Sequence, residues 1–341
     1  MSSTSEDNGD IDQQFVGGRG EITSSKKECT SSEQNNVDTI TEDLNSVAKL
    51  GDTSSCAACG KVSNSDDMNI CNKCKMVKYC NAACKKKHRS KHKKACERRV
   101  AELHEEQLFK DIEPEECPIC FQPLPIHIDQ TTFKSCCGKV VCNGCIYAMA
   151  MSEGKDLCAF CRMPPPTSEE EIERLKKLMG KDNAEAFSNL GGHFAEGSYG
   201  LSQDYRRANE LWLKAGELGC AGGYYNLGCS YRLGDGVEVD QKKAKYYFEL
   251  AAMHGHIKAR HNLGCSEKQA GNLHRAIKHM IMAAKAGDEV SLNTVKHCFM
   301  QGIVKKDEYA NALRAHQQRK DEMKSDARDK AAEPQNQVLF G

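Results

Sequence analysis

The sequence predicts two small cysteine-rich α+β modules followed by an all-α helical-repeat solenoid, with a disordered segment in front. Three observations predict this order. Fifteen of the 20 cysteines lie between Cys56 and Cys161, and the chain after residue 184 repeats at intervals of 37 and 36 residues. Residues 1–55 carry 11 acidic and 4 basic side chains among Ser, Thr and Asn. So few apolar groups cannot offset the entropy of ordering that segment.

Composition excludes several functions. The 48 Lys and Arg balance 48 Asp and Glu, which argues against a nucleic-acid binder charged over its whole surface. The sequence has no run of 18 apolar residues, so we expect no membrane-spanning helix. The first fifty residues also lack the apolar core of a secretory signal. We therefore expect an intracellular protein, cytoplasmic or nuclear. In that reducing compartment clustered cysteines indicate metal binding rather than disulfides.

The repeated half has two apolar-periodic stretches per unit, joined by a Gly/Asp turn. Leu190-Gly191, Leu227-Gly228 and Leu263-Gly264 mark the copies, and small Ala and Gly residues recur downstream of each pair. A single helical hairpin cannot bury its apolar face, so stacked copies must share a core. A helix is expected to start at Thr167 or Ser168, because glutamates follow three residues later in capping-box spacing.

The pattern in residues 226–255, which begins with Asn-Leu-Gly and ends with Ala-Ala-x-x-Gly, resembles a Sel-one-like repeat (SLR), a relative of the tetratricopeptide repeat. The resemblance covers about residues 184–325 and implies a protein-binding scaffold. The third copy departs from the pattern: Glu267 stands where the helix tyrosine is expected, and the Gly-x-Gly turn is shortened.

The first cysteine cluster has eight ligand-type residues in paired spacings: Cys56-x2-Cys59, Cys71-x2-Cys74, Cys80-x3-Cys84 and His92-x3-Cys96. Thiolate and imidazole suit Zn2+, and four ligands close a tetrahedral site, so two zinc ions are expected. The cluster resembles the MYND zinc finger at every ligand position. That resemblance implies an interleaved arrangement, in which Cys56, Cys59, Cys80 and Cys84 hold one ion and Cys71, Cys74, His92 and Cys96 hold the other. It also implies a docking module for proteins or peptides, with structural zinc.

A basic run of nine Lys and Arg with one acid lies between Lys85 and Arg99. It could be a patch for nucleic acid or an acidic partner. We interpret it as a solvated helix face, because short charge runs are commonly exposed surfaces. Nucleic acid and membrane are therefore not expected as partners.

The second cluster reads Cys117-x2-Cys120, Cys136-Cys137, Cys142-x2-Cys145 and Cys158-x2-Cys161. It resembles a RING finger. The resemblance implies one zinc ion held by Cys117, Cys120, Cys142 and Cys145, and a second held by Cys158 and Cys161 with one or both of Cys136 and Cys137. Lys139 stands where many RING fingers have a histidine ligand, and a protonated lysine does not bind zinc. One or two zinc ions are therefore expected in this module.

RING fingers typically act as ubiquitin ligases by holding a ubiquitin-loaded conjugating enzyme. On this resemblance Ile119 matches the exposed aliphatic residue that packs on the conjugating enzyme, and Arg162 matches the basic residue that bridges enzyme and ubiquitin. Ala159 stands where many active members have proline. The alternative is that Ile119 fills space between two ligands and Arg162 is a solvated charge.

The predicted order is a disordered acidic tail (1–55), a MYND-type finger (56–96), a helical spacer (97–116), a RING-like finger (117–162), Sel-one-like repeats (167–325) and a flexible tail (326–341). Two functions fit this order, and neither needs a catalytic side chain of the protein. One is a zinc-binding adaptor whose fingers and solenoid dock other proteins. The other is a RING-type ubiquitin ligase that recruits its substrate through the MYND-type finger and the repeats.

Overall fold

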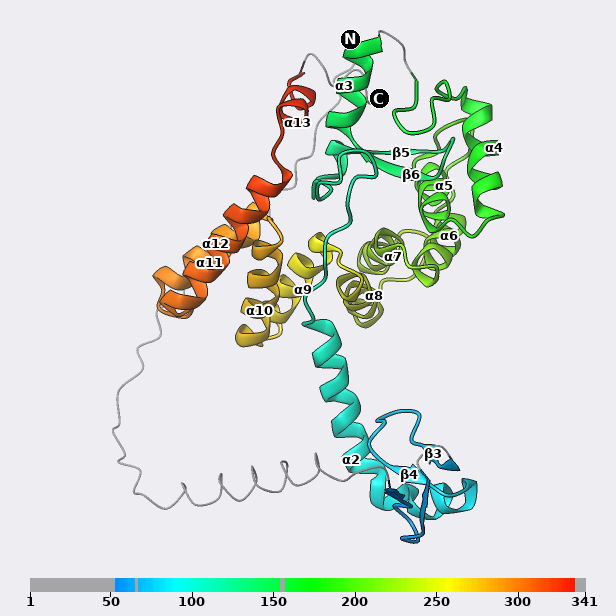
Figure 1. The fold of residues 1–341 in the computed structure, drawn as a ribbon, viewed down its shortest axis with the longest axis vertical. Helices are drawn as coiled ribbons and strands as arrows, with labels where there is room; N and C mark the ends of the chain where they lie inside the picture. Colours follow the sequence, from blue (N-terminus) through cyan, green and yellow to red (C-terminus); the bar gives the residue numbers. More distant parts are fainter. Residues whose placement is uncertain (1–52, 65–66, 154–156, 335–341) are drawn as a thin grey trace. The chain divides into compact units, whose positions relative to one another are not determined.

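The computed structural model describes residues 53–64, 67–153 and 157–334 (Figure 1). The predicted disordered tail lies outside these residues except for its last three, which form a strand. The chain divides into two compact units, one ending at Lys93 and the other beginning at Lys94. Among the described residues, none of the helices combines the length and the apolar character needed to cross a membrane.

The first unit is built from two short antiparallel hairpins and the start of a long helix. The hairpins are β1 with β2 and β3 with β4, and their bounds are Thr53–Ser55, Val62–Asn64, Asn69–Ile70 and Lys78–Tyr79. Helix α2 begins at Ala82, where the side-chain oxygen of Asn81 accepts a hydrogen bond from the backbone N–H of Cys84. Tyr79 is almost fully buried in this unit.

Helix α2 runs without a break from Ala82 to Leu108. The sequence predicts a separate helical spacer over 97–116, but the structure continues one helix through most of that range. No glycine or proline interrupts residues 82–108, so nothing ends the backbone hydrogen bonding at residue 96. The finger and the spacer therefore share one helix, and they differ in which compact unit each part of that helix mainly packs into.

The second cysteine module contains a short 3-10 helix, one antiparallel hairpin and one helix. These elements are η3 (Ile128–Gln130), β5 (Thr131–Lys134), β6 (Lys139–Cys142) and α3 (Asn143–Glu153). In the hairpin Lys134 pairs with Lys139, so only four residues form the turn between the strands. The side chain of Asn143 fixes the start of α3, because it donates to the carbonyl of Asp129 and accepts from the hydroxyl of Thr132.

The repeat array consists of successive helices of 12 or 13 residues, followed by a longer one of 18 residues. They are α4 (Ser168–Met179), α5 (Ala184–Glu196), α6 (Tyr205–Glu217), α7 (Ala221–Leu233), α8 (Gln241–Met253), α9 (Ile257–Gln269), α10 (Leu273–Lys285), α11 (Glu289–Met300) and α12 (Lys306–Met323). The predicted capping box at the first helix is confirmed, with Thr167 as the N-cap and Glu170 as its partner.

The glycine of each Leu-Gly pair lies against a large side chain of the following helix. A Cβ built on Gly191 would meet Trp212 at 2.6 Å, and one on Gly228 would meet Phe248 at 2.7 Å. The third copy keeps the geometry, with Met280 at 2.7 Å from a Cβ on Gly264. The repeated glycine therefore makes room for the bulky core residue of the partner helix.

The residues that follow the middle of α2 pack into the repeat array as part of the second unit. We call residues 105–112 the connecting segment. Leu108 is fully buried in a cluster with Phe248 and Leu263. The guanidinium of Arg260 donates to the carbonyl of Leu108 at 2.8 Å and to that of Lys110 at 3.4 Å. Helices α8, α9 and α10 thus already bind a segment of the same chain.

A helix, α13 (Asp326–Ala331), occupies part of the range for which the sequence predicts a flexible tail. It packs against α3 of the second cysteine module (Figure 1). Two alanines on a short polar helix gave no signal of this contact, because its partner lies about 180 residues earlier in the chain. The residues 335–341 lie outside the described part.

The second cysteine module is held by both ends of the helical array. On one side Phe133 packs against the core of α4–α7, Asn183 donates to the carbonyl of Gly138 at 3.2 Å, and Ser135 hydrogen-bonds to Glu171. On the other side lies α13, where Arg328 donates to the carbonyl of Pro123 at 2.9 Å. The module therefore forms a brace between α4 and α5 at the start of the array and α13, which follows the array's last helix.

Candidate metal centres

Four groups of four ligand-type side chains come together in the described residues. In each group the ligand atoms lie within 4.8 Å of one another, and the groups are Cys56/Cys59/Cys80/Cys84, Cys71/Cys74/His92/Cys96, Cys117/Cys120/Cys142/Cys145 and Cys136/Cys137/Cys158/Cys161. The first and third pairs of each cluster share one group, and the second and fourth pairs share the other. The structure thus brings the residues together in the interleaved order that both resemblances imply.

Four Cys-x2-Cys pairs, those that begin at Cys56, Cys71, Cys117 and Cys158, form the same tight turn. The backbone N–H after the second cysteine donates to the carbonyl of the first, as from Gly60 to Cys56 at 2.8 Å and from Phe121 to Cys117 at 2.9 Å. The donor residue has positive φ in all four turns: Gly60, Lys75, Phe121 and Arg162 at 74°, 57°, 58° and 63°. This turn directs both sulfurs of a pair to one point, while the remaining ligands come from helices or hairpins.

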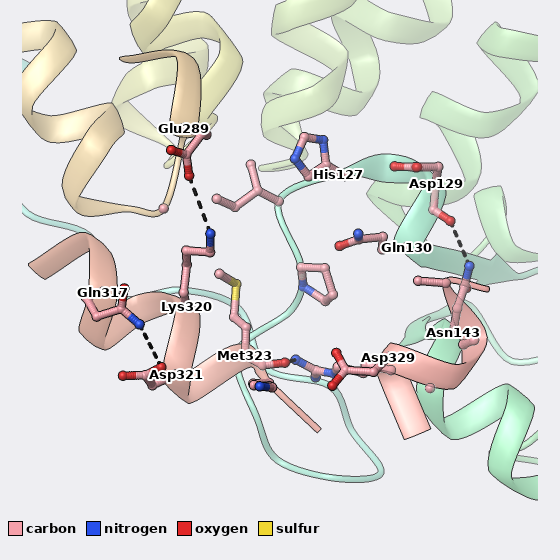
Figure 2. Close-up of a pocket in the computed structure, with 18 residues that line it drawn as sticks. His127, Asp129, Gln130, Asn143, Glu289, Gln317, Lys320, Asp321, Met323 and Asp329 are labelled. Carbon is pink, nitrogen blue, oxygen red and sulfur yellow. Dashed lines mark hydrogen bonds and ion pairs between the residues drawn. The ribbon is translucent and has the colours of Figure 1, made fainter. Parts of the chain in front are cut away.

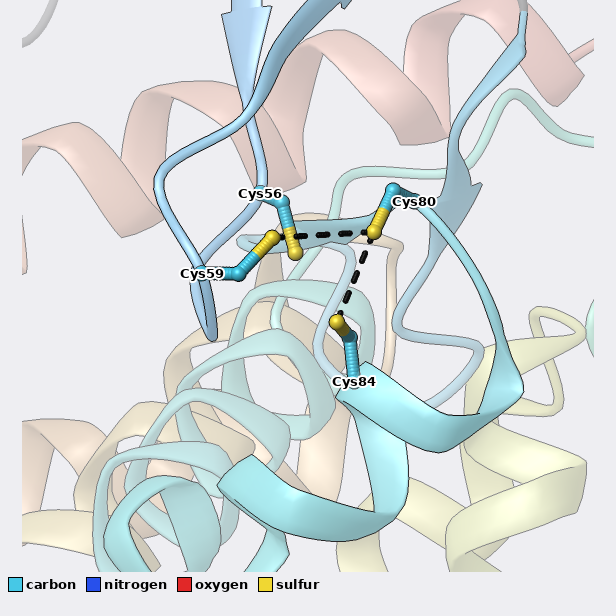
Figure 3. A group of neighbouring side chains, drawn as sticks. All are labelled: Cys56, Cys59, Cys80 and Cys84. Carbon is cyan, nitrogen blue, oxygen red and sulfur yellow. Dashed lines mark hydrogen bonds between the residues drawn. The ribbon is translucent and has the colours of Figure 1, made fainter.

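The first group shows this division clearly (Figure 3). Cys56 and Cys59 come from the turn after β1, whereas Cys80 precedes α2 and Cys84 lies on its first turn. The Sγ atom of Cys80 lies 3.7 Å from that of Cys59 and 3.4 Å from that of Cys84. One helix therefore carries ligands of both groups in this module, since His92 and Cys96 follow on α2.

The spacing of the sulfur atoms fits zinc. Four sulfurs placed about 2.3 Å from one Zn2+ in a tetrahedron lie about 3.8 Å apart. The Cys117–Cys145 and Cys120–Cys142 sulfur pairs lie at 3.9 and 3.8 Å. In the first module Cys74 Sγ lies 3.3 Å from His92 Nε2, so the imidazole faces the same point. All four groups contain thiol and imidazole donors only, which is a donor set that suits zinc over magnesium or calcium.

The last group contains both of the adjacent cysteines. Cys136 Sγ lies 3.3 Å from Cys161 Sγ, and Cys137 Sγ lies 3.9 Å from Cys158 Sγ. Both sit in the turn of the β5–β6 hairpin, which Gly138 closes with a φ of 70°. Lys139 begins β6 and is exposed, outside the group. The structure therefore places both adjacent cysteines in one group with Cys158 and Cys161.

Because the thiols lie close together, the pKa of one is lowered while that of its neighbour is raised. A hydrogen bond from Cys145 lowers the pKa of Cys142 to about 4 and raises that of Cys145 well above its ordinary value. Two thiolates so close together repel each other, and a divalent cation relieves that repulsion by allowing every sulfur to lose its proton. The side chains present therefore fit a metal of charge +2.

The two residues proposed to contact a conjugating enzyme have different surroundings. Ile119 is partly buried and packs against Cys117, Val141 and Ile146. Arg162 is exposed and donates to the sulfur of Met149 at 3.4 Å. Because its backbone occupies the left-handed position of a Cys-x2-Cys turn, Arg162 also has a structural role. Ala159 lies partly buried against the same cluster as Ile119.

A cavity of about 660 Å³ lies where the second module meets α12 and α13 (Figure 2). Some of its polar side chains pair with one another: Lys320 pairs with Glu289 at 3.4 Å, and Gln317 donates to Asp321 at 2.9 Å. Such a lining gives no clear preference for one class of ligand.

These features define a class: a helical-repeat protein that carries cross-braced cysteine modules of the zinc-finger type. Comparison with known families makes this specific. The MYND finger family model matches residues 56–96, and the Sel1 repeat model matches 184–220, 221–256 and 258–288. The chain therefore contains a MYND finger and three Sel1 repeats, as predicted. Residues 117–162 lie outside these matched ranges, as do α11 and α12.

Two solved structures are similar to part of the chain. A Sel1 repeat protein from Oxalobacter formigenes has 20% identity and a TM-score of 0.41, over 51% of this chain and 70% of that one. The protein c5321, a protective antigen of uropathogenic Escherichia coli with an SLR fold, has 20% identity and a TM-score of 0.40. That match covers 58% of this chain and 43% of the antigen.

Three fully or partly buried polar residues escaped the sequence analysis as functional groups. Glu267, fully buried, accepts hydrogen bonds from Lys245 and Arg275 at 2.7 and 3.0 Å. His279, also fully buried, lies 4.7 Å from the ring of Phe109. Arg328 reaches the second module from α13. Only Glu267 left a sequence signal, since it breaks the tyrosine pattern of the repeat.

Proposed function

We propose that this protein is a non-catalytic adaptor whose zinc ions are structural and whose modules dock other proteins. The observation that carries the proposal is the donor chemistry of the four groups. Each offers four thiol or imidazole ligands, and four such ligands complete a tetrahedral zinc site without leaving a position for substrate or water. When bound, zinc would supply folding free energy to modules that have small apolar cores.

The MYND finger and the Sel1 repeats support an adaptor for a second reason. Both are generally protein-interaction modules, and here most of the finger lies in a different compact unit from the repeats. The proposal places docking on the finger and on repeat surfaces other than the part of α8–α10 that the connecting segment covers.

A capture experiment with two disabling variants tests the adaptor. Cys74→Ser removes a ligand from the MYND finger, and Leu227→Asp places a charge in the core of the repeats. We expect two disjoint sets of bound proteins, one lost with each variant. A protein from one set should co-purify with a protein from the other set only when the wild-type chain is present to join them. A single set lost with both variants would contradict the adaptor.

The second candidate is a RING-type ubiquitin ligase. Its support is the complete set of eight sulfur ligands in the second module, despite the lysine at position 139. Against it stand the partial burial of Ile119 and the packing of α13 on α3.

A ubiquitin discharge assay separates the two candidates. Zinc-loaded chain is mixed with a panel of ubiquitin-charged conjugating enzymes, beside Ile119→Ala and Arg162→Ala variants. Phe121→Ala is the matched control, because Phe121 occupies the same turn position as Arg162 and is 72% exposed. A ligase would accelerate transfer to free lysine, and only the first two variants would lose the effect. If no enzyme of the panel is accelerated, the adaptor stands.

A further inference from the structure

Arg328 lies where no sequence pattern predicts a role, at the contact between α13 and the second cysteine module. Its Nη2 donates to Cys120 Sγ at 3.4 Å. Its Nη1 donates to the carbonyls of Pro123 and Met323 at 2.9 and 2.8 Å. The guanidinium thus joins three points: a ligand-type sulfur, the loop just after it, and the end of α12.

The position of Arg328 is fixed from the backbone outward. A Cβ built on Gly144 would meet Cγ of Arg328 at 2.6 Å and its backbone N at 2.8 Å, so α13 contacts α3 where that helix has no side chain. The N–H of Arg328 also donates to the hydroxyl of Ser325, which caps α13. Its Nε is buried and has no hydrogen-bond partner among the described residues. A partly buried guanidinium with a buried, unused donor is costly unless negative charge lies nearby.

The group of Cys117, Cys120, Cys142 and Cys145 supplies that charge when it binds metal. Four thiolates around one Zn2+ have a formal charge of −2. Cys117 and Cys142 are buried, so water screens the charge only in part. A guanidinium that donates to a ligand sulfur offsets the excess negative charge and fixes the position of that sulfur.

We propose that Arg328 is a positioning residue for this metal centre, supplied from α13, and that the centre binds zinc tightly only when α13 is docked. The inference rests on the proposed zinc binding of the second module and adds a dependence on a residue outside it. Residues that hydrogen-bond to metal ligands typically change metal affinity by 10–100-fold when replaced.

The test uses the full chain loaded with 113Cd, which gives a separate NMR resonance for each metal centre. A Cys120→Ser variant identifies the resonance of the centre in question. Affinity at each centre is then measured by competition with a chelator for the wild type, Arg328→Gln and Arg328→Lys. Arg174→Gln is the matched control, since Arg174 also bonds a carbonyl and a side chain in this unit, at 3.1 and 3.4 Å, but lies on α4.

We expect Arg328→Gln to weaken metal binding 10–100-fold at the Cys120 centre and shift its resonance. The other centres should keep their affinity, and Arg174→Gln should behave as wild type. Arg328→Lys should be intermediate, because one ammonium cannot reach all three acceptors in the same geometry. Unchanged affinity in Arg328→Gln would overturn the inference, as would equal weakening of every centre. A wild-type chain that lacks the Cys120 resonance would instead refute zinc binding by the module.

Discussion

The repeated glycines matter here for the side chain that they lack. Gly191 lies inside α5, where glycine is a poor helix former, yet it faces the indole of Trp212. Its neighbour Gly192 has nothing within 4 Å of a built Cβ. Two adjacent glycines of one helix thus differ only in what a methyl group would meet.

This difference predicts opposite effects of one substitution. Gly191→Ala should lower the free energy of unfolding by roughly 1–3 kcal/mol, because the methyl group overpacks against Trp212. Gly192→Ala should raise it by roughly 0.5–1 kcal/mol, because alanine forms helix better and meets no neighbour. Urea denaturation followed by far-UV circular dichroism measures both. Equal shifts in one direction would contradict the packing role of the repeat glycine.

At the scale of elements, the connecting segment places Phe109 over a helix rich in cations. Phe109 contacts His279 of α10, and the charged ends of Arg275 and Lys278 lie 5.6 and 4.6 Å from its ring. Burial lowers the pKa of His279 to about 3, with further lowering from Arg260, Arg275, Lys245 and Lys278. The histidine is therefore neutral in the folded protein at neutral pH.

A neutral buried histidine makes the array less stable in acid. The unfolded chain takes up a proton near pH 6.5, whereas folded His279 does so only near pH 3. The free energy of unfolding therefore has its full value above pH 6.5 as far as His279 is concerned. It falls by about 1.4 kcal/mol per pH unit as the pH drops from 6.5 towards 3. We expect His279→Met to reduce the loss of unfolding free energy between pH 6.5 and 5.0 by about 2 kcal/mol.

Denaturation at the two pH values measures this loss. The exposed His274 on the same helix gives the control variant, His274→Met, which should leave the loss as in wild type. An identical pH dependence in His279→Met and wild type would show that His279 does not stay neutral on folding.

Local patterns predict local elements, and the differences occur where distant segments meet. The repeat helices and the Thr167 cap follow from period and capping chemistry, which act within a few residues. The grouping of Cys136 with Cys137 depends on a hairpin turn of four residues that spacing alone does not give. The docking of α13 could not be predicted, because complementarity between Gly144 and Arg328 appears only after both helices are placed.

At the scale of the whole molecule, the four donor groups predict how metal and fold are coupled. We expect four zinc ions per chain in native mass spectrometry. Cys158→Ser should leave three, while Cys220→Ser should leave four, because Cys220 lies in the repeats outside every group. Three ions in the wild type would mean that the Cys136/Cys137 group does not bind zinc.

Removal of zinc by a chelator should affect the units unequally. The cores of α5–α10 contain none of the grouped cysteines, so most of their helical signal should persist while both cysteine modules lose structure. Loss of all helical signal on chelation would show instead that the repeat array does not stay folded when the second cysteine module unfolds.

The brace between the second module and α13 also sets an order in time. Cys120 and Arg328 are separated by 208 positions in the chain. At a synthesis rate of about 5–20 residues per second, the ribosome makes Arg328 roughly 10–40 seconds after Cys120. During that interval the nascent module has its cysteines but not its arginine. On the role proposed for Arg328, this metal centre reaches its full zinc affinity only after translation has passed the entire array, so we expect a chain that stops before α13 to bind zinc less tightly there.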